Sequence, residues 1–568
     1  MRYGYFDDDA QEYVIERPDT PMSWVNYLGS SEYCSIVSNN GAGYSFHRSA
    51  KSGRLTRFRF NSVPMDRPGR YVYLRDATDG DYWSITWQPV AKPLEKIDVR
   101  AAHGLGYSRF ESEYRGIRSR MTVFVPLDDP IEVWDVEVEN ASDRTRELDV
   151  TGYTEWCFWD MMQDAFNFQY ILYTCRMAYE ADIVDYSIRL WPFREPKGFF
   201  ASTLPVQSFD TDREIFLGPY RHEGSAVAVE RGRCSDSIAT GGTPCGALQG
   251  SLVLAPGERR RFAYVLGIGD AKSFGRKCHT RFSDPAATDT EIERIARHWN
   301  ERLGKLRCRT PSSEVDSMVN VWNQLQCQTT FNWSRSASFN EAGGRDGLGY
   351  RDSNQDTLGV VHSIPELVRS RLRELLSGQL ASGAAMHSFQ PLGFTPGAHN
   401  AGGAAFSDDH LWLLLSVPAY LKETGDFGLL DEVLPYADQG SASGFAHLAR
   451  ALDFSWSKRG PHGLLLGLAA DWNDCLNLRG NGESMFSTLL YLHALEEFLK
   501  LAARLGRSAE ASKYREQQGA TLRAATEHAW DGSWFLRGYL DNGKPLGGKA
   551  SDQSKIFLNS QSWAVIAG

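Results

Sequence analysis

The chain has 568 residues, of which 42% are hydrophobic and 23% are charged, and its formal net charge is −10 at pH 7. This length exceeds what one compact core usually holds, so we expect two or more domains. The acidic balance argues against a nucleic-acid-binding protein, because such proteins need a basic face. No apolar run reaches about 18 residues, and the N-terminus lacks the apolar core of a signal peptide. We therefore expect a cytoplasmic protein without a membrane span.

The cysteine pattern indicates reduced, mostly buried thiols. Nine cysteines are dispersed along the chain, and no two of them form a CxxC pair. An odd, scattered set in a protein that is not exported does not suggest a disulfide framework. A zinc site would need closely spaced cysteine or histidine pairs, and the sequence has none. We therefore expect no metal.

Up to about residue 270 the apolar residues follow the period of a β-strand. Trp134, Val136 and Val138 alternate with acidic residues, and the run ends in the turn signal at 140–143. The segment 261–266 alternates in the same way. Short aromatic and β-branched runs, separated by Gly, Pro, Asn and Asp, predict a large antiparallel sandwich. The aromatic-rich stretch 155–160 fits the core and rim of such a sandwich.

The period changes near residue 285. Ile292, Ile295, Trp299 and Leu303 fall at helical spacing. The sequence predicts further helices over 315–331, 364–381, 409–425, 484–506 and 509–530. We therefore expect a β domain, a helical linker and an all-α domain.

A glycine-rich loop at 344–356 is the first candidate binding segment. Among its glycines it holds Arg345, Arg351, Asp352 and Asp356. Arginine forks suit carboxylate, phosphate or vicinal hydroxyl groups, and aspartate accepts hydrogen bonds from sugar hydroxyls. The alternative interpretation is a solvated loop with internal Arg–Asp pairs.

The segment 470–477 is the second candidate. Asp471, Trp472 and Asp474 follow an apolar run, where loss of solvent can tune a carboxyl for general acid catalysis. The alternative is helix capping, with Asp471 as the N-cap and Asp474 in the first turn. Asp408 and Asp409 likewise suggest a cap with first-turn charges. Neither His103 nor His387 has a spacing that implies a metal site or a catalytic triad.

Together these stretches resemble glycoside hydrolase family 94, the cellobiose, cellodextrin and N,N′-diacetylchitobiose phosphorylases. The resemblance covers essentially the whole chain. The matching segments are 3–7, 12–15, 24–29, 43–46, 66–71, 83–89, 103–107, 349–356 and 470–477. The resemblance implies an N-terminal antiparallel β-sandwich domain over 1–272, a helical linker over 273–310 and an (α/α)₆ barrel over 311–568. It also implies a homodimer.

Carried over by position, the resemblance implies that Asp474 is the general acid. Arg345, Arg351, Asp352 and Trp472 would bind the non-reducing sugar, with Arg351 also near phosphate. The expected reaction is reversible, inverting phosphorolysis of a cellobiose-like β-linked disaccharide to α-D-glucose 1-phosphate and a free sugar, which is a hexosyl transfer. Inorganic phosphate is the co-substrate, and no cofactor is expected. Because phosphate is already anionic, one acid suffices, whereas an inverting hydrolase needs a second carboxylate.

Three alternatives stay open at this point. One is an N,N′-diacetylchitobiose phosphorylase that releases N-acetylglucosamine 1-phosphate. The start of the chain and the region 234–245 resemble that enzyme more closely, whereas the stretches 352–356 and 387–392 resemble the cellobiose enzyme and favour glucose. Another is an inverting β-glycoside hydrolase with Asp346, Asp352 or Asp356 as its base. The third is a non-catalytic carbohydrate-binding protein. The chain stops within an apolar segment, so we expect it to be a fragment. The resemblance further implies that the barrel is incomplete and that its other phosphate-binding residues lie beyond Gly568. A natural protein that ended there would be expected to lose phosphorolysis or to be severely impaired in it.

Overall fold

The computed structural model describes residues 2–59, 66–166, 169, 172–190, 194–334, 336–345, 347–390 and 405–568. The chain divides into two compact units. The first contains residues 1–325 and 335–346, and the second contains residues 326–334 and 347–568. An antiparallel sandwich precedes a helical domain, so the predicted fold class is confirmed. The linker boundaries at 272 and 310 stay a prediction.

Among the described residues, the larger sheet of the first unit has ten strands, and every pairing is antiparallel. In spatial order the strands are β1 (Gly4–Asp7), β2 (Glu12–Ile15), β9 (Asp98–Gly104), β10 (Tyr107–Tyr114), β11 (Ile117–Phe124), β12 (Ile131–Asn140), β19 (Arg259–Ile268), β16 (Lys197–Ser202), β15 (Ile183–Ile188) and β14 (Cys175–Glu180).

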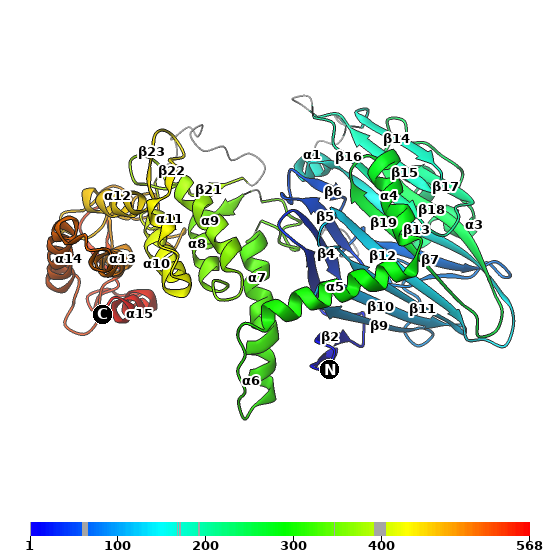
Figure 1. Cartoon of the computed structure of the whole chain (residues 1–568), viewed down its shortest axis with the longest axis horizontal. Helices are drawn as coiled ribbons and strands as arrows, with labels where there is room; N and C mark the ends of the chain where they lie inside the picture. Colours follow the sequence, from blue (N-terminus) through cyan, green and yellow to red (C-terminus); the bar gives the residue numbers. More distant parts are fainter. Residues whose placement is uncertain are drawn as a thin grey trace. The chain divides into compact units, whose positions relative to one another are not determined.

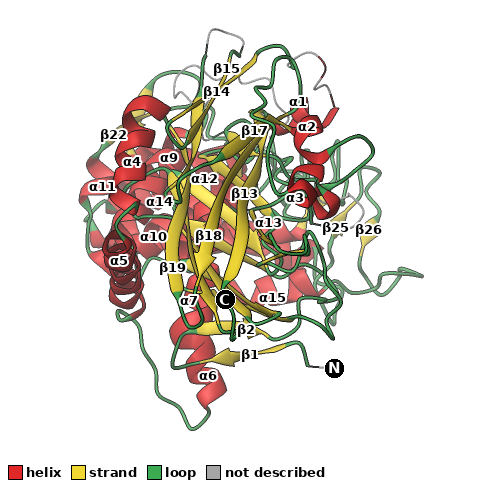
Figure 2. Ribbon diagram, turned by 90° about the vertical axis from the view of Figure 1, so that its right-hand side faces the viewer, coloured by secondary structure: helices red, strands yellow, loops and turns green. Residues whose placement is uncertain are grey.

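The second sheet counts nine strands in the same described ranges. Its main path is β17 (Ser208–Asp212), β18 (Pro244–Leu254), β13 (Arg146–Trp159), β6 (Arg54–Thr56), β5 (Gly43–His47), β4 (Tyr33–Ser38) and β3 (Val25–Gly29). β7 (Tyr71–Asp76) pairs with both β13 and β8 (Tyr82–Ser84). The paired strands β13 and β18 lie near the centre of Figure 2. There β18 contacts β19, which belongs to the ten-stranded sheet.

The alternation seen in the sequence places one set of side chains between the two sheets. Trp134, Val136 and Val138 are fully buried in this inter-sheet core, as predicted. On β19 the positions 262, 264 and 266 face the same core, whereas Ala263 and Val265 belong to a second apolar cluster on the outer face. A sheet that is covered on both faces explains why β19 carries apolar residues at consecutive positions.

Helices cover parts of both outer faces. α4 (Arg276–Phe282) lies against β19 (Figure 1), and α5 (Pro285–Leu303) adds its apolar stripe to the same outer cluster. Two short helices cover Tyr71 and Tyr73 on the other sheet. The remaining short elements are α1 (Met161–Phe166), α2 (Arg213–Leu217), η2 (Glu223–Ser225), α3 (Val227–Arg231), η3 (Ala271–Gly275), α6 (Ser313–Ser317) and η4 (Met318–Trp322).

The aromatic-rich stretch at 155–160 belongs to the sandwich core, as predicted. Trp156 and Phe158 are fully buried between the sheets. Glu155 is buried as well, and its carboxylate pairs with Arg57 at 3.2 Å and with Arg213 at 2.8 Å. A buried carboxylate held by two guanidinium groups is a structural feature, because the pair compensates the loss of solvation.

The second unit is mainly helical. Its helices are α8 (Tyr350–Leu358), α9 (Pro365–Ser377), η5 (Asp409–Trp412), α10 (Leu413–Thr424), α11 (Gly428–Asp431), α12 (Gly444–Ser457), α13 (Met485–Arg504), α14 (Ser508–His528) and α15 (Leu558–Ile566). α7 (Asn323–Trp333) spans the division between the units. The short strands are β20 (Leu348–Gly349), β21 (Ser388–Phe389), β22 (Val433–Pro435), β23 (Ser441–Ser443), β24 (Glu483–Ser484), β25 (Gly538–Tyr539) and β26 (Pro545–Leu546).

α13 is the helix around which the second unit packs. Its apolar stripe, which includes Leu489, Leu495 and Phe498, is buried, and it contacts α10, α12, α14 and α15. A helix that is apolar over most of its surface requires neighbours on several sides. None of the described helices is long and apolar enough to cross a membrane. The loops that precede α8, η5 and α13 hold most of the candidate site residues.

Candidate active site

The loop that carries Asp474 does not begin a helix. Asp471 Oδ1 accepts a hydrogen bond from the N–H of Asn473 at 2.9 Å, and Asn473 Oδ1 accepts one from the N–H of Cys475 at 3.1 Å. Two successive turns are therefore closed by Asx side chains. The next helix, α13, takes its cap from Ser484. The interpretation of Asp471 and Asp474 as helix-capping residues is wrong.

Asp471 anchors this loop in the interior. Its Oδ2 accepts hydrogen bonds from Nη2 of Arg537 at 2.5 Å and from Oγ of Ser484 at 2.6 Å, and all three side chains are buried. Breaking such a pair would leave an uncompensated buried charge, so the loop base is strongly fixed. The exposed fraction is 56% for the Asp474 side chain and 51% for Trp472. A rigid base thus presents two side chains that substrate can reach.

Arg351 joins three segments of the second unit. It lies in the first turn of α8 (Figure 1), and only 4% of its side chain is exposed. Nη1 donates to Asp408 Oδ1 at 3.2 Å and to the carbonyl of Asp471 at 3.0 Å. Nη2 donates to Oδ1 of Asp474. One guanidinium group therefore holds a buried carboxylate on one side and an accessible carboxylate on the other.

Backbone pairing brings these segments together. β20 pairs with β21, and the N–H of Tyr350 donates to the carbonyl of His387 at 2.9 Å, so the start of α8 lies beside His387. The N–H of Ser407 donates to the carbonyl of Ala470 at 3.0 Å. This bond places Asp408 beside the loop 470–477, which carries Asp471 and Asp474 and is called the acidic loop below. The contacts around Arg351 thus depend on chain segments that are far apart in the sequence.

Asp408 and Asp409 do not act as simple helix-capping residues. Asp408 precedes η5, but its side chain makes no capping hydrogen bond, and both carboxyl groups are buried. Asp408 Oδ2 instead accepts from Nε1 of Trp412 at 3.1 Å, and Oδ1 accepts from Arg351. Burial, and then the charge of Asp409, raise the pKa of Asp408 to about 7. Burial also raises the pKa of Asp409. From the sequence, neither Asp408 nor Asp409 was predicted to belong to the site.

His387 has a partner that its spacing in the sequence did not indicate. Its Nδ1 lies 3.0 Å from Asp409 Oδ2, and its ring stacks on Phe406 with centroids 3.8 Å apart. The hydrogen bond with Asp409 raises the pKa of His387, so its charged form is favoured. His103, in contrast, is buried in the sandwich, where burial lowers its pKa to about 4.

The structure brings Trp472 and Asp352 to the same unit as Arg351. Trp472 Nε1 lies 3.4 Å from Oε1 of Gln355, so the indole is linked to α8. Asp352 lies in the first turn of α8, and a Cβ added at Gly349 would come within 2.0 Å of its Oδ2. A glycine at this position therefore lets the backbone approach the carboxylate closely.

Arg345 lies in the first unit, where its Nε pairs with Oε2 of Glu341 at 3.0 Å and its side chain is mostly exposed. Of the carboxylates considered as a hydrolytic base, Asp346 lies outside the described residues. Asp356 is five residues beyond Arg351, about 140° around the helix, and its charge acts on Arg371 and Cys327. Asp352 is therefore the described candidate that shares a turn with Arg351.

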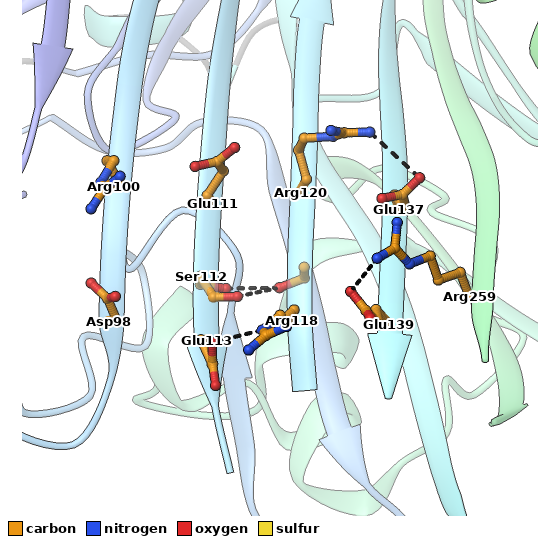
Figure 3. A pocket seen from close by; sticks show the side chains of 11 residues that line it. Asp98, Arg100, Glu111, Ser112, Glu113, Arg118, Arg120, Glu137, Glu139 and Arg259 are labelled. Atoms are coloured by element: carbon orange, nitrogen blue, oxygen red, sulfur yellow. Dashed lines mark hydrogen bonds and ion pairs between the residues drawn. The ribbon is translucent and has the colours of Figure 1, made fainter. Parts of the chain in front are cut away.

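A polar hollow lies on the outer face of the ten-stranded sheet and has a volume of about 350 Å³. Figure 3 shows its charged side chains projecting from β9, β10, β11, β12 and β19. They form pairs across neighbouring strands, with Arg118–Glu113 at 2.9 Å and Arg259–Glu139 at 3.1 Å. Such exposed pairs are typical of a solvated sheet face. In the described ranges, no cluster of three or more His, Cys, Asp or Glu residues could hold a metal ion.

Comparison with known proteins relates both units to one family. Residues 298–568 match the glycosyl hydrolase 94 superfamily catalytic domain, and residues 11–285 match the glycosyl hydrolase 94 supersandwich domain. The N,N′-diacetylchitobiose phosphorylase of Vibrio proteolyticus is 42% identical over all of this chain and 73% of its own length. The solabiose phosphorylase of Paenibacillus borealis is 30% identical over all of this chain and 72% of its own length. A bacterial glucoamylase complexed with acarbose shares the fold, with a TM-score of 0.52, 9% identity, and coverage of 93% of this chain and 73% of its own.

Proposed function

The chain belongs to the glycosyl hydrolase 94 superfamily, and we propose that it catalyses inverting phosphorolysis of a β-linked disaccharide. The single observation that carries this proposal is the contact between buried Arg351 and accessible Asp474. This contact supports the proposal because it holds a carboxyl group, the proposed proton donor, beside a fixed cation. Phosphorolysis requires both, because a leaving oxygen must be protonated and an anionic nucleophile must be held.

In the proposed reaction, a phosphate oxygen attacks the anomeric carbon from the face opposite the leaving group. The bond between this carbon and the glycosidic oxygen breaks, and its electron pair stays on that oxygen. Asp474 donates its proton to the same oxygen, so a neutral sugar leaves. Attack from the opposite face converts the β-linkage into an α-sugar 1-phosphate. Arg351 offsets the phosphate charge, and no second carboxylate is needed to generate the nucleophile.

We propose that Trp472 and Asp352 bind the sugar transferred to phosphate. The half-exposed indole of Trp472 offers an apolar face that suits the C–H side of a pyranose ring, and Asp352 can accept hydrogen bonds from its hydroxyls. Arg345 is proposed as a further sugar-binding residue. The expected co-substrate is inorganic phosphate, without another cofactor.

N,N′-diacetylchitobiose is the substrate that we propose should be tested first. From the sequence we expect glucose, but the relatives from Vibrio proteolyticus and Vibrio furnissii, at 42% and 41% identity, carry the name N,N′-diacetylchitobiose phosphorylase. The product would then be N-acetyl-α-D-glucosamine 1-phosphate. Other relatives are named for solabiose and for a glucopyranosyl glucuronide, so a cellobiose-like substrate is the second candidate.

The experiment is a panel of β-disaccharides incubated with the full-length protein, with and without phosphate. We expect a sugar 1-phosphate of α configuration only when phosphate is present, identified by phosphorus and proton NMR. Asp474→Asn should slow its release by about 10²-fold or more. Cys475→Ser is a matched control, because Cys475 is the exposed neighbour in the same turn and has no carboxyl group. Release of free sugars at an equal rate without phosphate would instead support an inverting hydrolase.

A cytoplasmic homodimer is the proposed state of the protein. Sedimentation velocity at micromolar concentration would measure the mass directly against the 63.7 kDa of one chain. A single species of that mass would contradict the dimer. Full phosphorolysis after exhaustive dialysis against a chelator is the expected result for an enzyme without a metal cofactor.

A further inference from the structure

Two carboxylates share the guanidinium group of Arg351. Asp408 is fully buried, and its Oδ1 accepts a hydrogen bond from Nη1 at 3.2 Å. Asp474 is more than half exposed, and its carboxylate accepts a hydrogen bond from Nη2. The proposed mechanism uses Arg351 and Asp474 but assigns nothing to Asp408. Yet Asp408 is the only carboxylate among the described residues that has a direct ion pair with the Nη1 side of this arginine.

The geometry creates a conflict that Asp408 can relieve. A guanidinium group next to a carboxylate favours the ionised form of that carboxylate, and a general acid must be protonated. A second carboxylate on the same guanidinium offsets part of its positive charge. It therefore weakens the attraction between Arg351 and the carboxyl group of Asp474, and it also fixes Arg351 in place.

We propose that Asp408 is a positioning residue that anchors Arg351 and weakens its pull on Asp474, so that Asp474 can hold a proton. This inference rests on the proposed function, in which Asp474 is the acid. Phosphate would act in the same direction as Asp408, because its negative charge also competes with Asp474 for Arg351.

The other charged groups around this centre come from each neighbouring segment. Asp409 follows Asp408 in the chain, and Asp471 faces Asp408 from the acidic loop. Asp352, on the same helix as Arg351, acts on Asp409. His387 binds Asp409 and also interacts electrostatically with both Arg351 and Asp474. Asp408 differs from all of these groups because its side chain is hydrogen-bonded to Arg351 on the side opposite Asp474.

The test is the pH dependence of phosphorolysis in Asp408→Asn. The amide keeps the shape and can still accept a hydrogen bond from Trp412, but it cannot carry the negative charge. We expect the alkaline limb of the kcat profile, where the acid loses its proton, to move about one pH unit lower. The difference between the two proteins should grow above pH 7, because burial gives Asp408 a pKa of about 7 and its charge is present only above that value.

Asp409→Asn is the matched control. Asp409 is also buried and lies next to Asp408, but its ion pair is with His387 and not with Arg351. We expect its alkaline limb to move by less than half as much. A uniform loss of kcat in Asp408→Asn, with the limb at the wild-type pH, would mean that Asp408 is only structural and would overturn the proposal. Thermal unfolding checks that both variants fold.

A second readout separates this inference from the proposed function. If the wild-type protein releases no sugar 1-phosphate, the proposed function fails, but the protonation of Asp474 can still be followed by difference infrared spectroscopy. The protonated carboxyl band is assigned by its absence in Asp474→Asn. We expect this band to disappear at a lower pH in Asp408→Asn than in the wild type. Equal pH values in the two proteins would overturn the inference about Asp408.

Discussion

Two regions of the molecule contain the same types of charged side chain, but one region exposes them to solvent and the other buries them. On the ten-stranded sheet, arginine and glutamate side chains form pairs across neighbouring strands and are partly exposed (Figure 3). Around Arg351 the charges are fewer, but the arginine and Asp408 are almost entirely buried. Water solvates each member of the sheet pairs, so each pair contributes little to the free energy of unfolding. In the helical unit the charged partners replace water, so the position and charge of each group affect those of its neighbours.

The difference in burial leads to a difference in consequence. Removing one member of an exposed pair leaves a solvated charge, whereas removing one member of a buried pair leaves a charge without compensation. Only the second situation can tie the protonation of one group to the position of another. The Arg351 region is therefore suited to catalysis, and the sheet region is suited to keeping a broad strand surface solvated.

Arg351→Met should have the largest effect. It leaves buried Asp408 without its guanidinium partner, so we expect the free energy of unfolding to fall by about 3 to 5 kcal/mol. Phosphorolysis should fall as well, because neither phosphate nor Asp474 retains its cation. Urea unfolding and initial rates measure the two effects. A loss of less than about 1 kcal/mol would show that the buried pair behaves like the exposed ones.

Asp474→Asn should separate activity from stability. We expect kcat to fall about 10²- to 10⁴-fold, because the leaving oxygen loses its proton donor. The free energy of unfolding should change by less than about 1 kcal/mol, since the side chain is more than half exposed. A variant that kept more than about a tenth of its activity would remove Asp474 from the role of acid.

The buried network around Arg351 should make its own contribution to the pH dependence of stability. The folded-state pKa values of Asp408, Asp409 and His387 are all raised, so these three groups bind more protons in the folded protein than in the unfolded chain. Their contribution to the free energy of unfolding should therefore fall as pH rises from about 5 to about 7.5, by an amount on the order of 2 kcal/mol. Urea unfolding of the wild type and of Asp408→Asn at several pH values measures this contribution as the difference between the two slopes. Equal slopes would exclude Asp408 as its main source.

Sequence patterns were sufficient to predict structural features that depend on residues close together in the chain. Alternation at Trp134, Val136 and Val138 predicted a strand with one face in the core, and the structure confirms it. The apolar stripe of α13 was visible for the same reason. Both patterns reflect periods of two and 3.6 residues, which local geometry imposes.

The candidate site was harder to predict because its contacts join distant segments. Asp408 meets Arg351 across 57 residues, and His387 meets Asp409 across 22. Local spacing instead suggested helix capping for Asp408 and Asp471, since aspartate is favoured both at caps and in Asx turns. Sequence reasoning alone could not choose between these uses, and it needed the family resemblance to single out Asp474. The roles of Asp474, Arg351, Asp352, Trp472 and Arg345 stay predictions.

Arg118→Met should have the smallest effect and provides the matched comparison for Arg351→Met. Arg118 pairs with Glu113 at 2.9 Å on the exposed sheet face, and both side chains are about half exposed. We expect the free energy of unfolding to fall by less than about 1 kcal/mol, and the loss should shrink further at high salt because solvent ions screen exposed charges. Phosphorolysis should keep its wild-type pH profile. Urea unfolding at low and high ionic strength measures the loss, and a fall of 3 kcal/mol or more would mean that burial does not distinguish the two regions.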